Sequence, residues 1–149
     1  MRLEGEVSID TAIENVWQVF MDPAMLCHVT PGCEEVRRID ATHYEGRMAV
    51  KVQFLTIRAT WQGALIEARE PEYLMADIAG EATKLAGAFQ ARLAIALSAE
   101  GAATRARYTC DISMLGRLGN LGEPIVRSTS QKLVRRVAES IAGLFEPSG

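Results

Sequence analysis

The side chains in this sequence best suited to metal binding or nucleophilic chemistry are its few cysteines and histidines. The cysteines are Cys27, Cys33 and Cys110, and the histidines are His28 and His43. Because the cysteines are odd in number and form no C-x-x-C pair, they indicate neither a disulfide framework nor a zinc site. Unpaired cysteines favour a reducing compartment. No spacing among these residues matches a tetrahedral metal site, so we expect no bound metal ion.

Cys33 belongs to a Pro31-Gly32-Cys33 loop that admits two interpretations. In the first, the loop is a gate at the mouth of a cavity or a partner contact, and Cys33 is a reactive thiol. In the second, Pro31 and Gly32 end a helix, and Cys33 fills a small buried site. A reactive thiol needs electropositive surroundings, whereas Glu34 and Glu35 follow at once. The structural interpretation is therefore favoured for the thiol, and Pro31 and Gly32 remain candidates for a cavity gate.

The motifs of common catalytic and phosphate-binding sites are missing. A Ser–His–acid set would need His28 or His43 beside a serine, and no G-x-S-x-G elbow is present. Gly116, Gly119 and Gly122 recur every third residue, which is not the G-x-G-x-x-G pattern of a dinucleotide site. We predict no catalytic residue. The glycines form either a plain connection or a hinge, with Gly119 and Gly122 as further gate candidates.

A long amphipathic helix is predicted over residues 120–145. Its apolar stripe at helical spacing consists of Leu121, Ile125, Val126, Leu133, Val137, Ile141, Leu144 and Phe145. Asn120 is the expected N-cap, and Pro124 is tolerated in the first turn. The opposite side carries Arg127, Lys132, Arg135, Arg136 and Glu139. This basic side is either a solvated face or a contact with anionic lipid head groups or an acidic partner.

The chain before this helix reads as one strand, two short helices and six strands. The first strand covers residues 2–9, and a capping box of Thr11 and Glu14 then begins a helix. Asp22-Pro23 ends that helix and starts the second, which Pro31-Gly32 stops. The six strands are expected at residues 34–39, 43–54, 56–68, 73–80, 86–97 and 103–114. Hairpin-length connections imply an antiparallel meander.

This order of elements is that of the α+β helix-grip fold, of the START and birch-pollen-allergen type. We expect a single domain over residues 1–149, in which a seven-stranded, curved antiparallel sheet surrounds the long C-terminal helix. Small inward residues such as Ala59, Gly63 and Ala91 either leave room for a ligand or let the helix approach closely. A cavity is favoured. The predicted ligand-binding residues are Val52, Phe54, Trp61, Leu65, Leu74, Phe89, Leu93, Tyr108, Ile112, Met114, Leu133 and Val137.

Composition narrows the function classes. The formal charge of −3 and the pI near 5.4 argue against a nucleic-acid-binding protein. The hydrophobic fraction of 48% is sufficient for one core. No run reaches the roughly 18 apolar residues of a membrane span, and the first residues lack the apolar stretch of a signal peptide.

Residues 22–36 carry a recognisable pattern, D-P…L…P-G-C-E…V, with Val16-Trp17 upstream. This pattern resembles the CoxG family of carbon monoxide dehydrogenase proteins, which belongs to the START-like, or SRPBCC, superfamily. Further similar positions are Tyr44-Glu45-Gly46, Glu70-Pro71, Gly87, Tyr108 and residues 116–122. The resemblance covers essentially the whole chain.

The resemblance implies a cytoplasmic accessory protein of a molybdenum-containing dehydrogenase, carbon monoxide dehydrogenase above all. It also implies a quinone or other lipid in the cavity and a link between the enzyme and the membrane. Family members often end in an apolar membrane-binding segment, whereas this chain stops at Glu146-Pro147-Ser148-Gly149. We therefore expect membrane contact to be at most peripheral, at the inner face of the cytoplasmic membrane.

Three functions follow as hypotheses. The first is a non-enzymatic carrier in which Tyr108 donates a hydrogen bond to a carbonyl group of the ligand. The second is a cyclase, aromatase or hydrolase acting in the same cavity, which needs an inward ionisable group with a shifted pKa. Only Tyr108 and Cys110 are candidates for that group, so the carrier is preferred. The third is a partner-binding module with a closed core. The sequence leaves the oligomeric state open.

Overall fold

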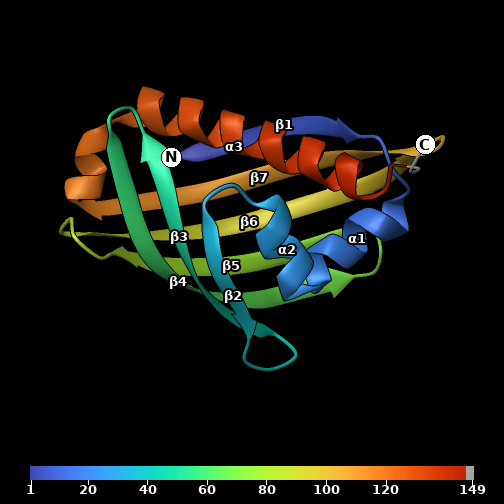
Figure 1. Ribbon diagram of the computed structural model, residues 1–149, viewed down its shortest axis with the longest axis horizontal. Helices are drawn as coiled ribbons and strands as arrows, with labels where there is room; N and C mark the ends of the chain where they lie inside the picture. The colour runs from blue at the N-terminus through green and yellow to red at the C-terminus, as the bar shows by residue number, and fades with distance from the viewer. Residues whose placement is uncertain (147–149) are drawn as a thin grey trace.

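A curved, seven-stranded antiparallel sheet wraps around one long C-terminal helix in the computed structural model (Figure 1). The structure describes residues 1–146. Along the chain the elements are β1 (Arg2–Ile9), α1 (Ile13–Met21), α2 (Pro23–Val29), β2 (Cys33–Arg38), β3 (His43–Val52), β4 (Leu55–Arg69), β5 (Tyr73–Ala82), β6 (Gly87–Glu100), β7 (Ala103–Gly116), the 3₁₀ helix η1 (Arg117–Leu121) and α3 (Glu123–Leu144).

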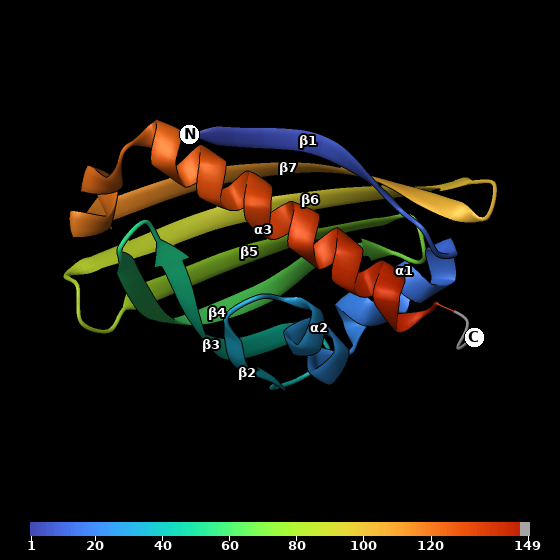
Figure 2. The same ribbon diagram turned by 45° about the horizontal axis from the view of Figure 1, so that its top comes forward.

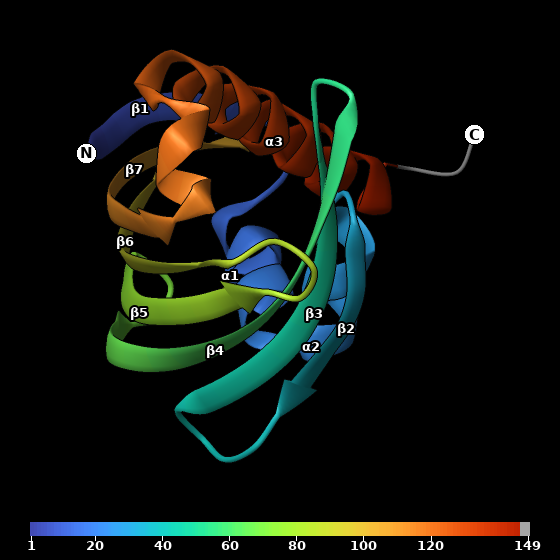
Figure 3. The same cartoon turned by 90° about the vertical axis from the view of Figure 1, so that its left-hand side faces the viewer.

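The strand order β1-β7-β6-β5-β4-β3-β2 makes every strand from β2 to β7 a neighbour of the next one along the chain. β1 leaves that meander and pairs with β7 along its whole length. Helices α1 and α2 therefore connect one edge of the sheet to the other. α3 crosses the concave side (Figures 2 and 3). The helix-grip fold predicted from the sequence is confirmed.

The connection between α1 and α2 is built as predicted. Asp22 follows the last residue of α1, and its Oδ1 atom accepts hydrogen bonds from the backbone N–H groups of Ala24 (3.0 Å) and Met25 (3.3 Å). Pro23 occupies the first turn of α2, where its missing N–H is not needed. One aspartate thus caps α2 directly after α1 ends.

The capping box predicted for α1 is wrong. The N-cap residue is Ala12, and no side chain caps this helix. Thr11 is instead buried, where its Oγ1 atom accepts a hydrogen bond from Asn15 Nδ2 at 2.9 Å. Its carbonyl oxygen accepts a hydrogen bond from the Thr104 hydroxyl at 2.7 Å. This contact with β7 joins residues that are far apart in sequence, and the local pattern contains no sign of it.

The predicted start of the last helix is also wrong. Asn120 lies within η1, and α3 begins at Glu123 with Gly122 as its N-cap. Gly122 has φ +84°, a backbone conformation that favours glycine. The glycine allows the chain to change direction between η1 and α3. Pro124 lies in the first turn, as expected.

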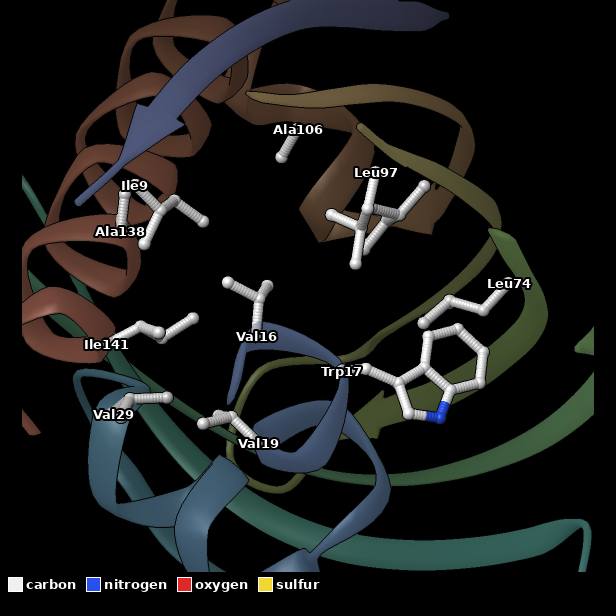
Figure 4. Close-up of a cluster of buried hydrophobic side chains, with 11 residues drawn as sticks. Ile9, Val16, Trp17, Val19, Val29, Leu74, Leu97, Ala106, Ala138 and Ile141 are labelled. Atoms are coloured by element: carbon white, nitrogen blue, oxygen red, sulfur yellow. The ribbon is translucent and has the colours of Figure 1, made fainter. Parts of the chain in front are cut away.

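The core occupies only one half of the space inside the sheet (Figure 4). It forms where α1 and the second half of α3 meet β5, β6 and β7. Its buried residues are Ile9, Val16, Trp17, Val19, Val29, Leu74, Ile95, Leu97, Ala106, Ala138 and Ile141. Val16, Val19 and Ile141 have no exposed surface. Because α1 fills this half, the space beneath the first half of α3 is closed by the sheet and that helix alone.

We expect a Thr104→Val substitution to lower the free energy of unfolding by about 1–3 kcal/mol. Valine has nearly the shape of threonine but cannot donate a hydrogen bond, so the buried carbonyl of Thr11 would lose its partner. Denaturant titration measures the change. Thr56→Val, at an exposed position of β4, is the control. Equal stability of the Thr104→Val variant and the wild type would show that this hydrogen bond is not needed.

Candidate functional site

An apolar cavity of about 200 Å³ lies between the sheet and the first half of α3. Four strands form its floor and one side, and η1 and α3 form its roof. The lining residues are Met48, Val50, Val52, Ile57, Ala59, Phe89, Ile112, Met114, Leu118, Leu121, Ile125, Val126, Thr129, Ser130 and Leu133. Only Thr129 and Ser130 contribute hydroxyl groups to this lining, and it contains no ionisable side chain.

The size and chemistry of the cavity restrict what it can hold. An engineered cavity of about 150 Å³ with an apolar lining stays dry and binds benzene. Pockets for drug-sized ligands usually measure about 300–1,000 Å³. The cavity of about 200 Å³ therefore fits one ring with small substituents. A longer ligand has to leave it through an opening.

The structure places the predicted ligand-binding residues in two separate regions. Five of them line the cavity, namely Val52, Phe89, Ile112, Met114 and Leu133. Leu74 belongs to the core, and four more pack against it in the other half of the molecule, namely Leu65, Leu93, Tyr108 and Val137. The hydroxyl of Tyr108 is therefore not part of the cavity wall. Trp61 does not line the cavity either.

The prediction that Phe54 faces the interior is wrong. β3 ends at Val52, two residues earlier than expected, and Phe54 lies in the turn to β4 with 104% relative exposure. Gln53 has φ +56°. A residue in this left-handed conformation ends the alternation of inward and outward side chains. The two-residue period therefore cannot be extended through the turn.

The expectation that small inward residues leave room for a ligand holds at few positions. Gly46 and Gly80 lie directly across from Trp61 and Phe89 on the neighbouring strands. A Cβ atom at either glycine would collide with the facing aromatic ring. These glycines make room for aromatic side chains rather than for a ligand. Of the small inward residues named from the sequence, only Ala59 lines the cavity.

Sequence reasoning missed the part of the wall that comes from η1 and α3. Leu118 falls in a predicted connection, because a short 3₁₀ helix has no periodic pattern. Leu121, Ile125 and Val126 belong to the predicted apolar stripe of the last helix but not to the predicted ligand site. Their spacing contained the signal, since they share a face with Leu133. No signal pointed to the hydroxyl groups of Thr129 and Ser130.

The four predicted gate residues lie at two openings near the cavity. Gly119 and Gly122 line a small pocket beside η1, together with Met1 and Glu123. Pro31 and Gly32 line a larger groove between α3 and β3. The carbonyl oxygen of Gly32 accepts a hydrogen bond from the backbone N–H of Ala49 on β3 at 2.8 Å. The loop between α2 and β2 is therefore attached to β3.

The larger groove, called the basic groove below, adjoins the cavity. The two share Val50, Ile125, Thr129 and Leu133 in their walls. The volume of the groove is about 940 Å³. Its charged lining residues are Lys51, Lys132, Arg135, Arg136 and Glu139. An apolar cavity and a predominantly cationic surface thus lie side by side along α3.

The prediction that no disulfide is indicated is wrong. Cys27 and Cys33 form a disulfide with an Sγ–Sγ distance of 2.06 Å, which joins the last turn of α2 to the first residue of β2. The chain turns at Pro31-Gly32, so the two Cα atoms lie 5.3 Å apart despite the separation of six residues. Cys33 is therefore neither a reactive thiol nor a buried space-filling thiol. The expectation of a reducing compartment loses its basis.

Cys110 is the free cysteine within the described residues. Burial raises the pKa of its thiol, and the negative charge of Asp111 raises the pKa further. The protonated form is therefore favoured, whereas the thiolate is the nucleophilic form. This thiol is also absent from the cavity wall.

The other shifted ionisable groups lie on the surface. The backbone N–H of Thr42, followed by the His43 side chain, lowers the pKa of Asp40 to about 2 by hydrogen bonding to its carboxylate. A hydrogen bond from Arg92 lowers the pKa of Asp77. None of these groups lines the cavity. The acid or base that an enzyme in this cavity would need is therefore not found in its wall.

Tyr44 on β3 has a buried hydroxyl group with no hydrogen-bond partner. A buried polar group without a partner costs free energy, so Tyr44→Phe should raise the free energy of unfolding by about 1 kcal/mol. Thermal and denaturant unfolding measure this change. Tyr108→Phe is the control, because the Tyr108 hydroxyl is not a buried group of this kind. A clear loss of stability in Tyr44→Phe would mean that the hydroxyl does have a partner.

Residues 1–146 contain neither a metal-binding cluster nor a membrane-spanning helix. No group of three or more His, Cys, Asp or Glu side chains in this part of the chain is arranged to hold a metal ion. No helix in the same range combines the length and the apolar character needed to cross a membrane.

Comparisons with known proteins give one family and several similar structures. The sequence model of the carbon monoxide dehydrogenase family CoxG matches residues 5–144. A conserved protein from Geobacillus kaustophilus is similar in structure, with a TM-score of 0.87 and 18% identity over 97% of this chain and 94% of that one. No curated protein sequence matches this chain.

Two similar structures have descriptions that name a superfamily or an activity. A START superfamily protein from Mycobacterium smegmatis has a TM-score of 0.70 and 12% identity over 96% of this chain and 95% of that one. The Zhui aromatase/cyclase from Streptomyces sp. R1128 has a TM-score of 0.70 and 15% identity over 97% and 92%. At these identities the likeness concerns the fold alone.

Proposed function

This chain belongs to the CoxG family of carbon monoxide dehydrogenase proteins, and we propose that it is a non-enzymatic accessory protein that carries a hydrophobic, ring-bearing ligand such as a quinone. The supporting observation is the cavity beneath α3, whose wall is apolar except for two hydroxyl groups. Such a wall favours a neutral ring over a charged substrate, because a charge buried without a partner is costly.

The wall also suggests how a quinone would be oriented. Its carbonyl oxygens accept hydrogen bonds but cannot donate them, and Thr129 and Ser130 supply hydroxyl donors from α3. These two residues take the role that the sequence suggested for Tyr108, which packs against the core. The ring occupies the cavity of about 200 Å³, and an isoprenoid tail extends from it into the adjoining basic groove.

The proposed partner is a molybdenum-containing dehydrogenase of the carbon monoxide dehydrogenase type. A quinone with a long tail is too apolar to diffuse freely through water. A carrier that encloses the ring can collect the molecule at a membrane and present it to an enzyme. The accessory protein would thus link the enzyme to the membrane by moving the ligand between them.

Native mass spectrometry of the protein purified from its own host tests this proposal. The expected spectrum contains a species heavier than the chain by the mass of one quinone or related lipid, which denaturation releases for identification. A collapsed cavity, with no saturable binding of added quinone to the apo protein, would refute the proposal. No lining residue can act as an acid or a base, so we propose no catalytic function for the same cavity.

A further inference from the structure

The cations around the basic groove differ from those on the convex face of the sheet. On that face Arg47 pairs with Glu35 at 2.8 Å and Arg92 pairs with Asp77 at 2.7 Å. Within residues 1–146, by contrast, no carboxylate lies within ion-pair distance of Lys51, Lys132, Arg135 or Arg136. The chain as a whole carries a net charge of −3, so this excess of positive charge is local.

An exposed aromatic side chain projects beside these cations. Lys51 and Gln53 line the groove, and the next residue is Phe54, with 104% relative exposure. Leu55 follows with 47%. Figures 1 and 3 show the turn between β3 and β4 rising next to α3. One side of the molecule therefore combines an apolar tip with a rim of unpaired positive charge.

We propose that this side docks on the surface of a lipid bilayer that contains anionic lipids. Phe54 and Leu55 enter the boundary between head groups and acyl chains, where apolar side chains are stabilised. Lys51, Lys132, Arg135 and Arg136 contact the anionic head groups, and each adds roughly 1 kcal/mol of attraction near such a surface. The long stems of lysine and arginine allow the charges to reach the head groups while the groove faces the acyl chains.

A bilayer matches these features better than an acidic protein surface does. Phe54 stands on a turn with its whole side chain in solvent, and no surrounding wall marks the edge of a protein interface. A single protruding ring inserts into a fluid surface at any position, whereas a protein partner would need a pocket to receive it. The cations come from β3 and α3 on both sides of the groove and can contact separate head groups.

This inference rests on the proposed function, because it names the surface through which the carried ligand enters. The basic groove shares Val50, Ile125, Thr129 and Leu133 with the cavity. When the groove lies against the bilayer, a ring can pass from the acyl chains into the cavity with little exposure to water. The transfer then avoids most of the cost of hydrating the apolar ligand.

The test is sedimentation of the protein with vesicles that contain no quinone, made either of phosphatidylcholine alone or of equal parts phosphatidylcholine and phosphatidylglycerol. We expect binding to the anionic vesicles, weakened by added salt. A triple Lys132→Gln, Arg135→Gln, Arg136→Gln variant should bind on the order of 100-fold more weakly. Phe54→Ala should bind about tenfold more weakly.

Two control variants separate this surface from general charge and general hydrophobicity. A triple Arg37→Gln, Arg92→Gln, Arg107→Gln variant changes the net charge equally but on the convex face, and Ile39→Ala removes an apolar side chain that is 59% exposed elsewhere. Both should bind anionic vesicles as the wild type does. The proposal is overturned if the wild type does not bind these vesicles, or if the controls lose as much binding as the groove variants.

The vesicle experiment is independent of the proposed ligand. Saturable binding of a short-chain quinone in solution, without vesicles, reports on the cavity alone. Quinone binding without vesicle binding would overturn the docking surface and leave the carrier function standing. Vesicle binding without quinone binding would support the docking surface and refute the carrier.

Discussion

An Ile141→Ala protein should have a free energy of unfolding about 2–5 kcal/mol lower than that of the wild type. Ile141 lies in the second half of α3, has no exposed surface and belongs to the core cluster with Val16 and Val19 of α1. Alanine would leave a cavity where α1, α3 and the sheet meet. For a chain of this size the loss corresponds to a melting temperature lower by roughly 5–15 °C.

Leu144→Ala is the matched control, since it lies three residues further along the same helix and is 38% exposed. Its cost should stay below about 1 kcal/mol. The folded Ile141→Ala protein should also retain ligand binding, because the core and the cavity occupy different halves of the molecule. Equal destabilisation by the two substitutions would contradict the assignment of the core to this end of α3.

An Ala59→Leu protein should bind a ring-sized ligand about 100-fold more weakly than the wild type. Ala59 is buried on β4 and lines the cavity. Leucine adds three carbon atoms, each comparable to the roughly 30 Å³ share of a water molecule, and so takes up close to half of the space. A loss of about 3 kcal/mol of apolar burial corresponds to this decrease in affinity. Fluorescence titration with a short-chain quinone measures it.

Stability separates this effect from unfolding. Filling an empty apolar space usually maintains or raises stability, so the Ala59→Leu protein should be at least as stable as the wild type. Ala96→Leu, at an exposed position of β6, is the control and should bind the ligand normally. Unchanged affinity in Ala59→Leu would show that the ligand, if bound, lies outside this cavity.

The fold could be predicted from the sequence because its signals are local and repeated. Alternation from Arg2 to Ile9 gave the bounds of β1, and turn residues gave the bounds of most other strands to within a few positions. The stripe of apolar residues at helical spacing identified the long α3. These signals depend on contacts between neighbours in the chain or on a periodic face, which the sequence displays directly.

The errors occur where a distant segment decides the local structure. Thr11 does not cap α1, because its carbonyl group is held by Thr104 from β7. The disulfide between Cys27 and Cys33 depends on the direction of one turn, and the number of cysteines says nothing about that direction. The prediction for Phe54 fails because the alternation does not continue beyond the last residue of β3.

The site could be predicted only in part, for a related reason. Inward-facing residues are evident from alternation, but whether they line a cavity depends on what lies above them. α1 covers Leu74 and its neighbours and makes them core, whereas the first half of α3 leaves free space above Ile112 and Met114. No residue type distinguishes these two groups. The position of α1 over one half of the sheet is a property of the folded chain.

The most direct test of the carrier function is NMR of the protein with ¹³C-labelled methionine methyl groups, titrated with a short-chain quinone. Met48 and Met114 line the cavity, while Met21 and Met25 pack against the core. We expect the signals of Met48 and Met114 to shift saturably and those of Met21 and Met25 to stay in place. Absence of saturable shifts, or shifts confined to Met21 and Met25, would contradict the assignment of the ligand to this cavity.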